Sequence, residues 1–303
     1  MAVLRIPEEE RTVREPEEIA RRLKVCWTPH YTESGVEASF PPVCEGSEDA
    51  WKAKSAAIIL DVEGVTTPVS FVHDVLFPYA RARVEAFLRR QSKEEDVRRA
   101  LEELKDQYLK DREDGLQPPP WPQAVRSRAS RPSTSSPDGL PACAYILWLM
   151  DHDRKTTGLK RLQGRIWEQG YKAGELRGQV YPDVPICLKT WRDQGLKVCI
   201  FSSGSILAQK LLFRHSDGGD LEPYITAHFD TTTGPKREAA SYRSMAGSLG
   251  LPPASILFIS DTVEELEAAR KAGLKTCLCI RETARPPAGS EHRVIRSLEA
   301  ARL

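Results

Sequence analysis

From Lys54 onward, short apolar runs alternate with amphipathic stretches, and this alternation constrains the fold more than any other feature of the sequence. Such a pattern is typical of strands joined by helical crossovers into a parallel sheet. The expected strands are residues 56–62, 197–201, 228–229, 255–260 and 275–280, each followed by polar or small residues. Ligands of open parallel sheets bind beyond the carboxyl ends of the strands, so these following residues are the candidates for a functional site.

About 135 residues separate the first expected strand from the second, far more than a crossover requires. We therefore predict a sheet domain at 54–78 and 182–303, interrupted by an inserted helical domain at 79–181. Helical apolar spacing runs through 79–110 and 144–174. Between these tracts, a Pro/Ser-rich stretch at about 114–142 predicts a surface loop, with a docking or phosphorylation segment as the alternative.

Residues 1–53 precede the first expected strand and lack its pattern, although 17–23 could form a short helix. Closely spaced acids near the N-terminus contradict a signal peptide, which would be apolar there, and a transit peptide, which would be poor in acids. The seven cysteines include no C-x-x-C pair, which favours buried reduced thiols over disulfides or zinc. We expect an N-terminal extension to which the sequence assigns no role, in a cytoplasmic protein that could also be nuclear in a eukaryote.

The charge balance indicates a small partner. The 44 Lys and Arg residues nearly equal the 43 Asp and Glu residues, so the formal net charge of +1 gives no electrostatic reason to expect nucleic acid or an anionic membrane. No apolar run approaches the ~20 residues that span a bilayer. We expect no nucleic-acid partner and no membrane span.

Two acidic residues follow the first expected strand. Asp61 and Glu63 are separated by one residue where the chain turns at Gly64. One carboxylate could attack phosphorus while the other acts as an acid or base, and a hard cation such as Mg²⁺ would offset the charge of carboxylate and phosphate. Taken alone, the pair could equally be a solvated strand end.

Polar residues also follow the later strands. Ser202 and Ser203 precede a helical pattern and could hold phosphate, or could simply cap a helix. Lys236 could neutralise charge between a carboxylate and a phosphate, although a lysine is usually solvated. Asp261 could complete a metal site with Asp61, or could be an N-cap, and Glu265 lies one helical turn beyond it.

The order acidic pair, serine, lysine, aspartate resembles the motif order of the haloacid dehalogenase superfamily of phosphatases. Five segments resemble more narrowly the enolase-phosphatases of methionine salvage, over about residues 57–280. They are DVEGVTTPVSFVHDVLFPYA, DRKTTGLKRLQGRIWEQGYKAGEL, SSGSILAQKLLFRHS, HFDTTTGPKREAASY and ILFISDTVEELEAARKAGLKT. The resemblance implies an α/β fold, with a Rossmann-like parallel sheet core and the helical insertion as a cap that closes over the site.

The resemblance also implies a role for each motif residue. Asp61 would be the nucleophile that forms an aspartyl-phosphate and a ligand of one Mg²⁺ per subunit, with Asp261 completing the metal shell. Glu63 would supply acid/base help and contact the metal through its backbone carbonyl. Ser202 and Ser203 would bind the phosphoryl group, and Lys236 would orient it. The enzyme would convert 2,3-diketo-5-methylthiopentyl 1-phosphate to the acireductone 1,2-dihydroxy-3-keto-5-methylthiopentene, and would be a monomer.

Four further positions bear on this resemblance. Val65 stands where the family usually has threonine, and valine keeps the β-branched shape without the hydroxyl. His73 and Lys155 match family segments within the helical insertion. They could contact substrate, or His73 could be a helix cap or surface histidine and Lys155 a solvated lysine. Glu265 could support the metal ligands or lie on an exposed helix face.

Two alternatives stay open at this point. The same fold could serve another phosphatase or a phosphomutase acting on a different small phosphorylated metabolite, whereas a dehalogenase would need neither Mg²⁺ nor an acid at position 63. The chain could also be a non-catalytic binding protein that engages a partner through its N-terminal region or its Pro/Ser-rich loop. A short N-terminal likeness to acireductone dioxygenases comes without the clustered histidines of a metal site, so no dioxygenase activity is expected.

Overall fold

The computed structural model describes residues 29–32, 35–38, 55–121, 140–281 and 291–301, in two compact units at 1–45 and 46–303. In the first unit, β1 (Pro29–Thr32) and β2 (Gly35–Ala38) pair antiparallel, with Pro29 opposite Ala38. The sequence did not predict these strands. The helix expected at 17–23 lies outside the described residues.

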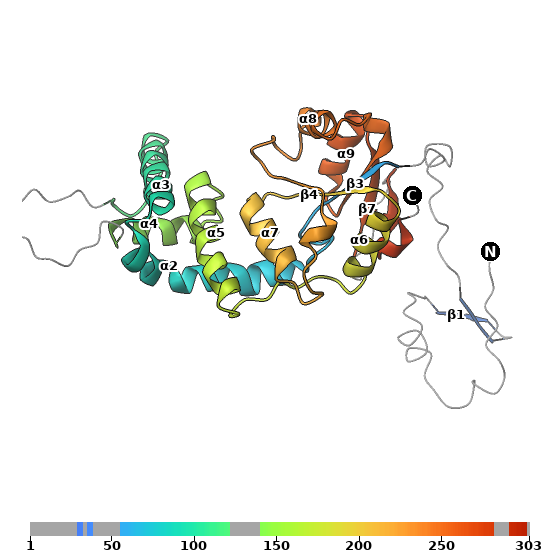
Figure 1. Ribbon diagram of the computed structural model, residues 1–303, viewed down its shortest axis with the longest axis horizontal. Helices are drawn as coiled ribbons and strands as arrows, with labels where there is room; N and C mark the ends of the chain where they lie inside the picture. Colours follow the sequence, from blue (N-terminus) through green and yellow to red (C-terminus); the bar gives the residue numbers. More distant parts are fainter. Residues whose placement is uncertain (1–28, 33–34, 39–54, 122–139, 282–290, 302–303) are drawn as a thin grey trace, which may run out of the picture. The chain divides into compact units, whose positions relative to one another are not determined.

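The second unit is built on a six-stranded sheet in which every strand pair is parallel (Figure 1). The strand order is β5-β4-β3-β6-β7-β8. The strands are β3 (Ala57–Leu60), β4 (Lys197–Phe201), β5 (Ala227–Phe229), β6 (Ile256–Ser260), β7 (Lys275–Cys279) and β8 (Arg293–Ile295). The first five confirm the expected strands to within two residues at each end, whereas β8 was not predicted.

Two apolar cores cover the two faces of this sheet, because alternate residues of each strand point to opposite sides. Ile58, Leu60 and Ile200 belong to one core, with α6 (Val184–Asp193) and α7 (Ile206–Arg214). Ile59 and Phe258 belong to the other, with α8 (Ala239–Leu249) and α9 (Val263–Lys271). The fold is therefore α/β with a Rossmann-like core, as the sequence implied.

The chain between β3 and β4 forms the helical cap. A π-helical segment, η3 (Phe71–Leu76), runs directly into α2 (Phe77–Gln91). Then follow α3 (Glu95–Glu113), α4 (Leu140–Asp151) and α5 (Thr157–Lys172), with α3 against α5 and α2 against α4. In Figure 1 these helices stand apart from the sheet, and α5 faces α7.

Each of the two predicted helical tracts is divided in the structure. The first breaks between α2 and α3, where Glu94 has an extended backbone with ψ of 139°. The second breaks between α4 and α5, where Asp153 has a φ of 47° and the Thr156 hydroxyl caps α5. Apolar periodicity continues across both breaks, which is why it did not reveal them.

Some predictions fall partly outside the described ranges. Of the Pro/Ser-rich stretch at 114–142, residues 122–139 are not described, and α4 already begins at Leu140. The cysteines of the described residues are free and buried, as expected. Within the same residues, none of the helices combines the length and apolar character that a membrane span needs. The domain boundaries at 54, 79 and 182 stay predictions.

Candidate active site

Polar residues follow four neighbouring strands of the sheet. They are Asp61 after β3, Ser202 after β4, Asp230 after β5 and Asp261 after β6. Leu60 pairs with both Ile200 and Ile259, so these strands end at the same edge of the sheet. Parallel pairing thus brings together residues that lie up to 200 positions apart in the sequence, as the sequence analysis expected.

Lys236 is the centre of a buried polar cluster at this edge. Its Nζ lies 2.7 Å from Asp61 Oδ2 and 2.8 Å from Glu265 Oε2. The fully buried Ser260 hydroxyl donates toward the same two oxygens, at 3.3 Å from Asp61 and 3.0 Å from Glu265. The Tyr242 hydroxyl donates to the backbone carbonyl of Lys236 at 2.6 Å. These bonds hold the lysine and the two carboxylates in one fixed arrangement.

The electrostatics of this cluster follow from its burial. Burial alone would lower the pKa of Lys236, but the charges of Asp61 and Glu265 raise it above its usual value. Burial, reinforced by the negative charge of Asp61, raises the pKa of Glu265. The ammonium therefore stays charged and compensates carboxylates that burial would otherwise destabilise.

The loop after β3 fixes the direction of the Asp61 carboxylate. The backbone N–H of Val62 donates to Asp61 Oδ1 at 2.7 Å, while Oδ2 faces Lys236. The buried Thr66 hydroxyl lies 3.2 Å from the carbonyl oxygen of Asp61 and 3.1 Å from that of Val62, which closes the turn. Both oxygens of the carboxylate are thus oriented by fixed donors.

Gly64 allows Asp261 to approach this loop. Its φ of 72° lies in the left-handed region that favours glycine, and a Cβ at this position would overlap the Asp261 carboxylate. Partial desolvation, followed by the negative charge of Asp61, raises the pKa of Asp261. The Asp261 carboxylate is therefore packed between the strand-end loop and a like charge.

The residues present fit a divalent cation. Among the described core residues, four carboxylates surround Lys236 closely enough to feel its charge, so negative charge exceeds positive. They are Asp61, Glu63, Asp261 and Glu265. Hard oxygen ligands and an excess of negative charge suit Mg²⁺. Within the described ranges no three His, Cys, Asp or Glu side chains form a ready metal site.

Ser202 and Ser203 stand before α7 rather than capping it. The helix N-cap is Ser205, whose hydroxyl accepts from the Ala208 N–H at 3.3 Å. Ser202 is buried, and its Oγ accepts from the Gly204 N–H at 3.1 Å. The N-cap alternative for the two expected phosphate ligands is therefore wrong, and both line the cavity described next.

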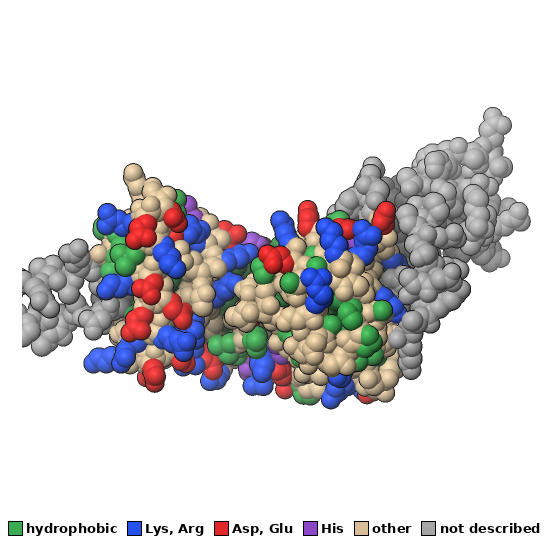
Figure 2. Space-filling model, turned by 90° about the horizontal axis from the view of Figure 1, so that it is seen from above, with side chains coloured by type: hydrophobic (Ala, Val, Ile, Leu, Met, Phe, Trp, Pro, Cys, Tyr) green, Lys and Arg blue, Asp and Glu red, His purple; other side chains and the backbone are tan. Residues whose placement is uncertain are grey.

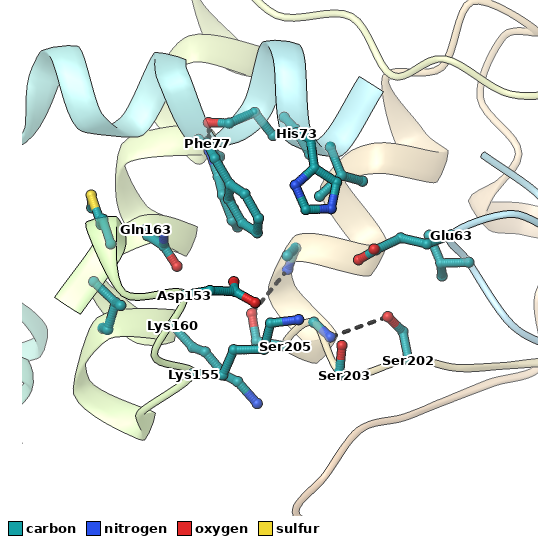
Figure 3. A pocket seen from close by; sticks show the side chains of 18 of the residues that line it. Glu63, His73, Phe77, Asp153, Lys155, Lys160, Gln163, Ser202, Ser203 and Ser205 are labelled. Atoms are coloured by element: carbon teal, nitrogen blue, oxygen red, sulfur yellow. Dashed lines mark hydrogen bonds between the residues drawn. The ribbon is translucent and has the colours of Figure 1, made fainter. Parts of the chain in front are cut away.

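A cavity of about 250 Å³ opens beside the strand ends and is shared by core and cap. Glu63, Ser202 and Ser203 line it from the core, and His73, Lys155 and other residues line it from η3, α2, α4, α5 and the segment between α4 and α5. Figure 3 shows Glu63, His73 and the serines around one space, and Figure 2 shows the surface hollowed between the helical and the sheet lobes. The cluster of Lys236, Asp61, Glu265 and Ser260 lies beside this cavity, as does Asp261.

Comparison with known proteins places the chain in a family. The model of haloacid dehalogenase-like hydrolases matches residues 56–273. Enolase-phosphatase E1 of Synechococcus elongatus is 49% identical over 224 residues, which cover 74% of this chain and 88% of that protein. The enzyme of the same name from Drosophila mojavensis is 40% identical over 235 residues, with coverage of 78% and 88%. The chain belongs to the enolase-phosphatase family.

A solved structure agrees with this family assignment. The UTR4 protein of Saccharomyces cerevisiae has a TM-score of 0.62 to this chain and 31% sequence identity, covering 82% of this chain and all of that one. The family model and the curated relatives show that the chain is a phosphatase of the haloacid dehalogenase superfamily, and Mg²⁺ is the cation that this superfamily generally uses.

The structure adds enolase-phosphatase site residues that the sequence did not single out. Ser260, the last residue of β6, bridges Asp61 and Glu265 from inside an apolar run. The side-chain amide of Gln209 donates to the carbonyls of Gly204 and Phe229, at 3.0 and 2.8 Å, and so supports the serine loop. Polar residues inside buried strands or on buried helix faces are the signal that could have found both.

Arg281 is a further residue of this kind. Its guanidinium donates to the Val65 carbonyl at 2.6 and 2.8 Å and pairs with Asp183 at 2.6 Å. Asp183 also accepts from Ser297 and from the Leu298 backbone, so the C-terminal segment is tied to the loop that carries Asp61. The bond from Arg281 to residue 65 uses the backbone carbonyl, which every residue provides. Valine in place of threonine therefore leaves this hydrogen bond intact.

Proposed function

We propose that the protein is a Mg²⁺-dependent enolase-phosphatase of methionine salvage. It converts 2,3-diketo-5-methylthiopentyl 1-phosphate to the acireductone 1,2-dihydroxy-3-keto-5-methylthiopentene and phosphate. The observation that carries the proposal is the Asp61–Lys236–Glu265 cluster, with a charged lysine 2.7 Å from a carboxylate that lies beside a cavity lined by Ser202 and Ser203. The proposal includes one Mg²⁺ per subunit, a monomer and a cytoplasmic location.

Phosphoryl transfer in this proposal starts at Asp61. Its carboxylate attacks phosphorus, and the fixed donors Val62 N–H and Lys236 Nζ orient it for that attack. Ser202 and Ser203 bind the phosphoryl oxygens, and Lys236 offsets the negative charge of carboxylate and phosphate. Glu63 protonates the leaving oxygen and then activates the water that hydrolyses the aspartyl-phosphate.

The metal ligands proposed are Asp61, Asp261 and the backbone carbonyl of Glu63. Bound Mg²⁺ would supply charge stabilisation during phosphoryl transfer and would polarise a substrate carbonyl, making the neighbouring C–H more acidic. Glu265 and Ser260 position Asp61 and Lys236 without touching substrate. In this division Ser260 and Glu265 lie behind the Asp61 carboxylate and do not line the cavity.

The cap side of the cavity suits the rest of the substrate. Phe77, Leu159 and Trp167 provide an apolar wall for a methylthio chain. Positive charge that suits an anionic substrate comes to the same cavity from Arg154, Lys155 and Lys160. Lys160 also donates to Thr231 of the core at 3.0 Å, so the cap and the core meet at the cavity.

The test follows phosphate release and enol absorbance together, using the diketo phosphate with and without Mg²⁺. Signals in both channels that need Mg²⁺ support the two-step enolase-phosphatase. Phosphate release from generic esters alone would assign the site to another phosphorylated metabolite. The absence of both phosphate release and enol absorbance would favour a non-catalytic binding protein.

A further inference from the structure

His73 lies where the core meets the cap. It belongs to η3, the π-helical segment that follows the Asp61 loop and runs into α2. π-Helical turns are rare and occur mostly at functional sites. The neighbouring Phe71 and Val72 are buried, whereas the imidazole is exposed and lines the cavity. The ring of His73 meets the edge of Phe77, with a centroid distance of 5.5 Å, so the apolar wall of the cavity fixes one side of the imidazole.

The imidazole faces the space in front of Glu63. Burial raises the pKa of Glu63, the charge of Lys155 opposes this rise, and a protonated His73 would oppose it as well, so both groups lie near that carboxyl. Figure 3 shows the His73 ring and the Glu63 carboxyl on opposite sides of one opening. Among the described residues, no hydrogen bond engages either ring nitrogen of His73. A substrate carbon between the phosphate-binding serines and the apolar wall would therefore meet a nitrogen that has no competing partner.

The other cavity groups are poorer proton acceptors. Arg81 and Arg154 stay charged, and each is already paired with an aspartate. Lys155 and Lys160 are lysines, which must lose a proton before they can accept another, and Lys160 donates its Nζ to Thr231. Glu63 serves in the proposed function as the acid that protonates the leaving oxygen. Asp153 is exposed, and aspartate is a weak base. Imidazole is the side chain whose usual pKa lies closest to neutrality, which suits proton abstraction from carbon.

We propose that His73 is the catalytic base that removes the carbon-bound proton in the enolisation step, an inference that rests on the proposed function. The imidazole takes a proton from C1 of the diketo phosphate, the electron pair of that C–H bond becomes the C1=C2 double bond, and the C2 carbonyl π electrons move onto its oxygen. The imidazolium then returns the proton to this oxygen, which leaves the enol phosphate and neutral His73. The step needs no other reactant.

The experiment compares His73→Gln with wild type, and His152→Gln serves as the matched control because His152 is an exposed histidine that does not line the cavity. Three rates are measured with Mg²⁺ present: enol absorbance, deuterium uptake at C1 of the diketo phosphate in D₂O, and hydrolysis of p-nitrophenyl phosphate, which needs no enolisation. Circular dichroism and thermal unfolding check that each variant is folded.

General-base catalysis typically contributes ~10²–10⁴-fold, so His73→Gln should lose enol formation and C1 exchange by that factor. Its hydrolysis of p-nitrophenyl phosphate should stay close to wild type, and His152→Gln should keep all three rates. Enol formation near the wild-type rate in His73→Gln would overturn the assignment, as would an equal loss in all three channels. A wild-type enzyme that hydrolyses p-nitrophenyl phosphate but never forms enol would instead overturn the proposed function, and with it this inference.

Discussion

The two sides of the cavity are built in different ways. On the core side, Asp61, Lys236, Glu265 and Ser260 are buried or nearly so, and their hydrogen bonds and ion pairs measure 2.7–3.3 Å. On the cap side, His73 of η3 and Asp153 and Lys155 of the segment between α4 and α5 are exposed. A preorganised set of charges suits one fixed transition state, whereas an open wall suits entry, selection and closure. Under the proposed function, phosphoryl transfer belongs to the core side, and substrate selection and enolisation belong to the cap side.

The largest effect is expected from Asp61→Asn. An amide cannot act as the nucleophile, so phosphate release should fall by roughly 10⁴-fold or more, as for other nucleophiles that act as part of a unit. Asp193→Asn, an exposed change on α6, is the control and should keep the wild-type rate. Near-normal phosphate release by Asp61→Asn would show that Asp61 is not the nucleophile and that the core side does not carry phosphoryl transfer.

Gly64→Ala should have the next largest effect. The new Cβ would overlap the Asp261 carboxylate, and alanine would have to adopt a left-handed backbone. We therefore expect a lower kcat and a free energy of unfolding lower by about 1–3 kcal/mol. Gly174→Ala is matched, because Gly174 has the same φ of 72° but no atom within 4 Å of the added Cβ. Equal losses of activity in the two variants would show that backbone strain alone, and not the approach of Asp261, explains the effect.

A pair of lysine variants compares the two sides directly. Lys236→Met leaves Asp61 and Glu265 without their cation and should lower kcat by ~10²–10³-fold, since removing one such preorganised donor typically costs that much. Lys155→Met removes a charge from the cap wall and should mainly raise KM for the diketo phosphate. Steady-state kinetics separate the two results. A dominant kcat effect at Lys155 would place the cap lysine in the chemical step.

The smallest effect is expected from deletion of residues 122–137. This deletion spares Trp121, whose ring lies 5.9 Å from those of Tyr108 and Tyr145 and packs the cap. Because the deleted stretch is predicted to be a surface insertion, kcat should stay within about twofold of wild type, as for changes remote from the chemistry. Trp121→Ala serves as a comparison and should lower the thermal stability. A large loss of kcat on deletion would show that residues 122–137 contribute to the function of the cap.

The core side could be predicted from sequence because strand ends are a local signal. Short β-branched runs mark the strands, and parallel pairing then gathers whatever polar residues follow them, which is how Asp61, Ser202 and Asp261 were found together. The expected strands were confirmed for the same reason. β8 (Arg293–Ile295) was missed although it matches β5 in length and burial, with three residues of which one is buried, so a run this short does not mark a strand reliably.

What the sequence missed depends on contacts between distant residues. Ser260 is a polar residue at the end of an apolar strand, and the sequence gives no sign of its role. Its hydroxyl lies between the carboxylates of Asp61 and Glu265, which are 199 and 5 positions away. Arg281 lies 216 positions from the carbonyl it holds, and nothing local predicts that bond. The helix breaks at Glu94 and Asp153 were missed because apolar spacing reports which face is buried and not where the backbone stops.

The central claim is that the core carries the phosphoryl group on Asp61. The most direct test quenches the enzyme during turnover of the diketo phosphate with Mg²⁺, reduces the sample with borohydride, and identifies residue 61 by mass spectrometry. Borohydride converts an aspartyl-phosphate to homoserine and leaves an ordinary aspartate unchanged. The account predicts homoserine at position 61 only in samples quenched during turnover. Unmodified Asp61 in samples that release phosphate at the full rate, or homoserine at another aspartate, would contradict it.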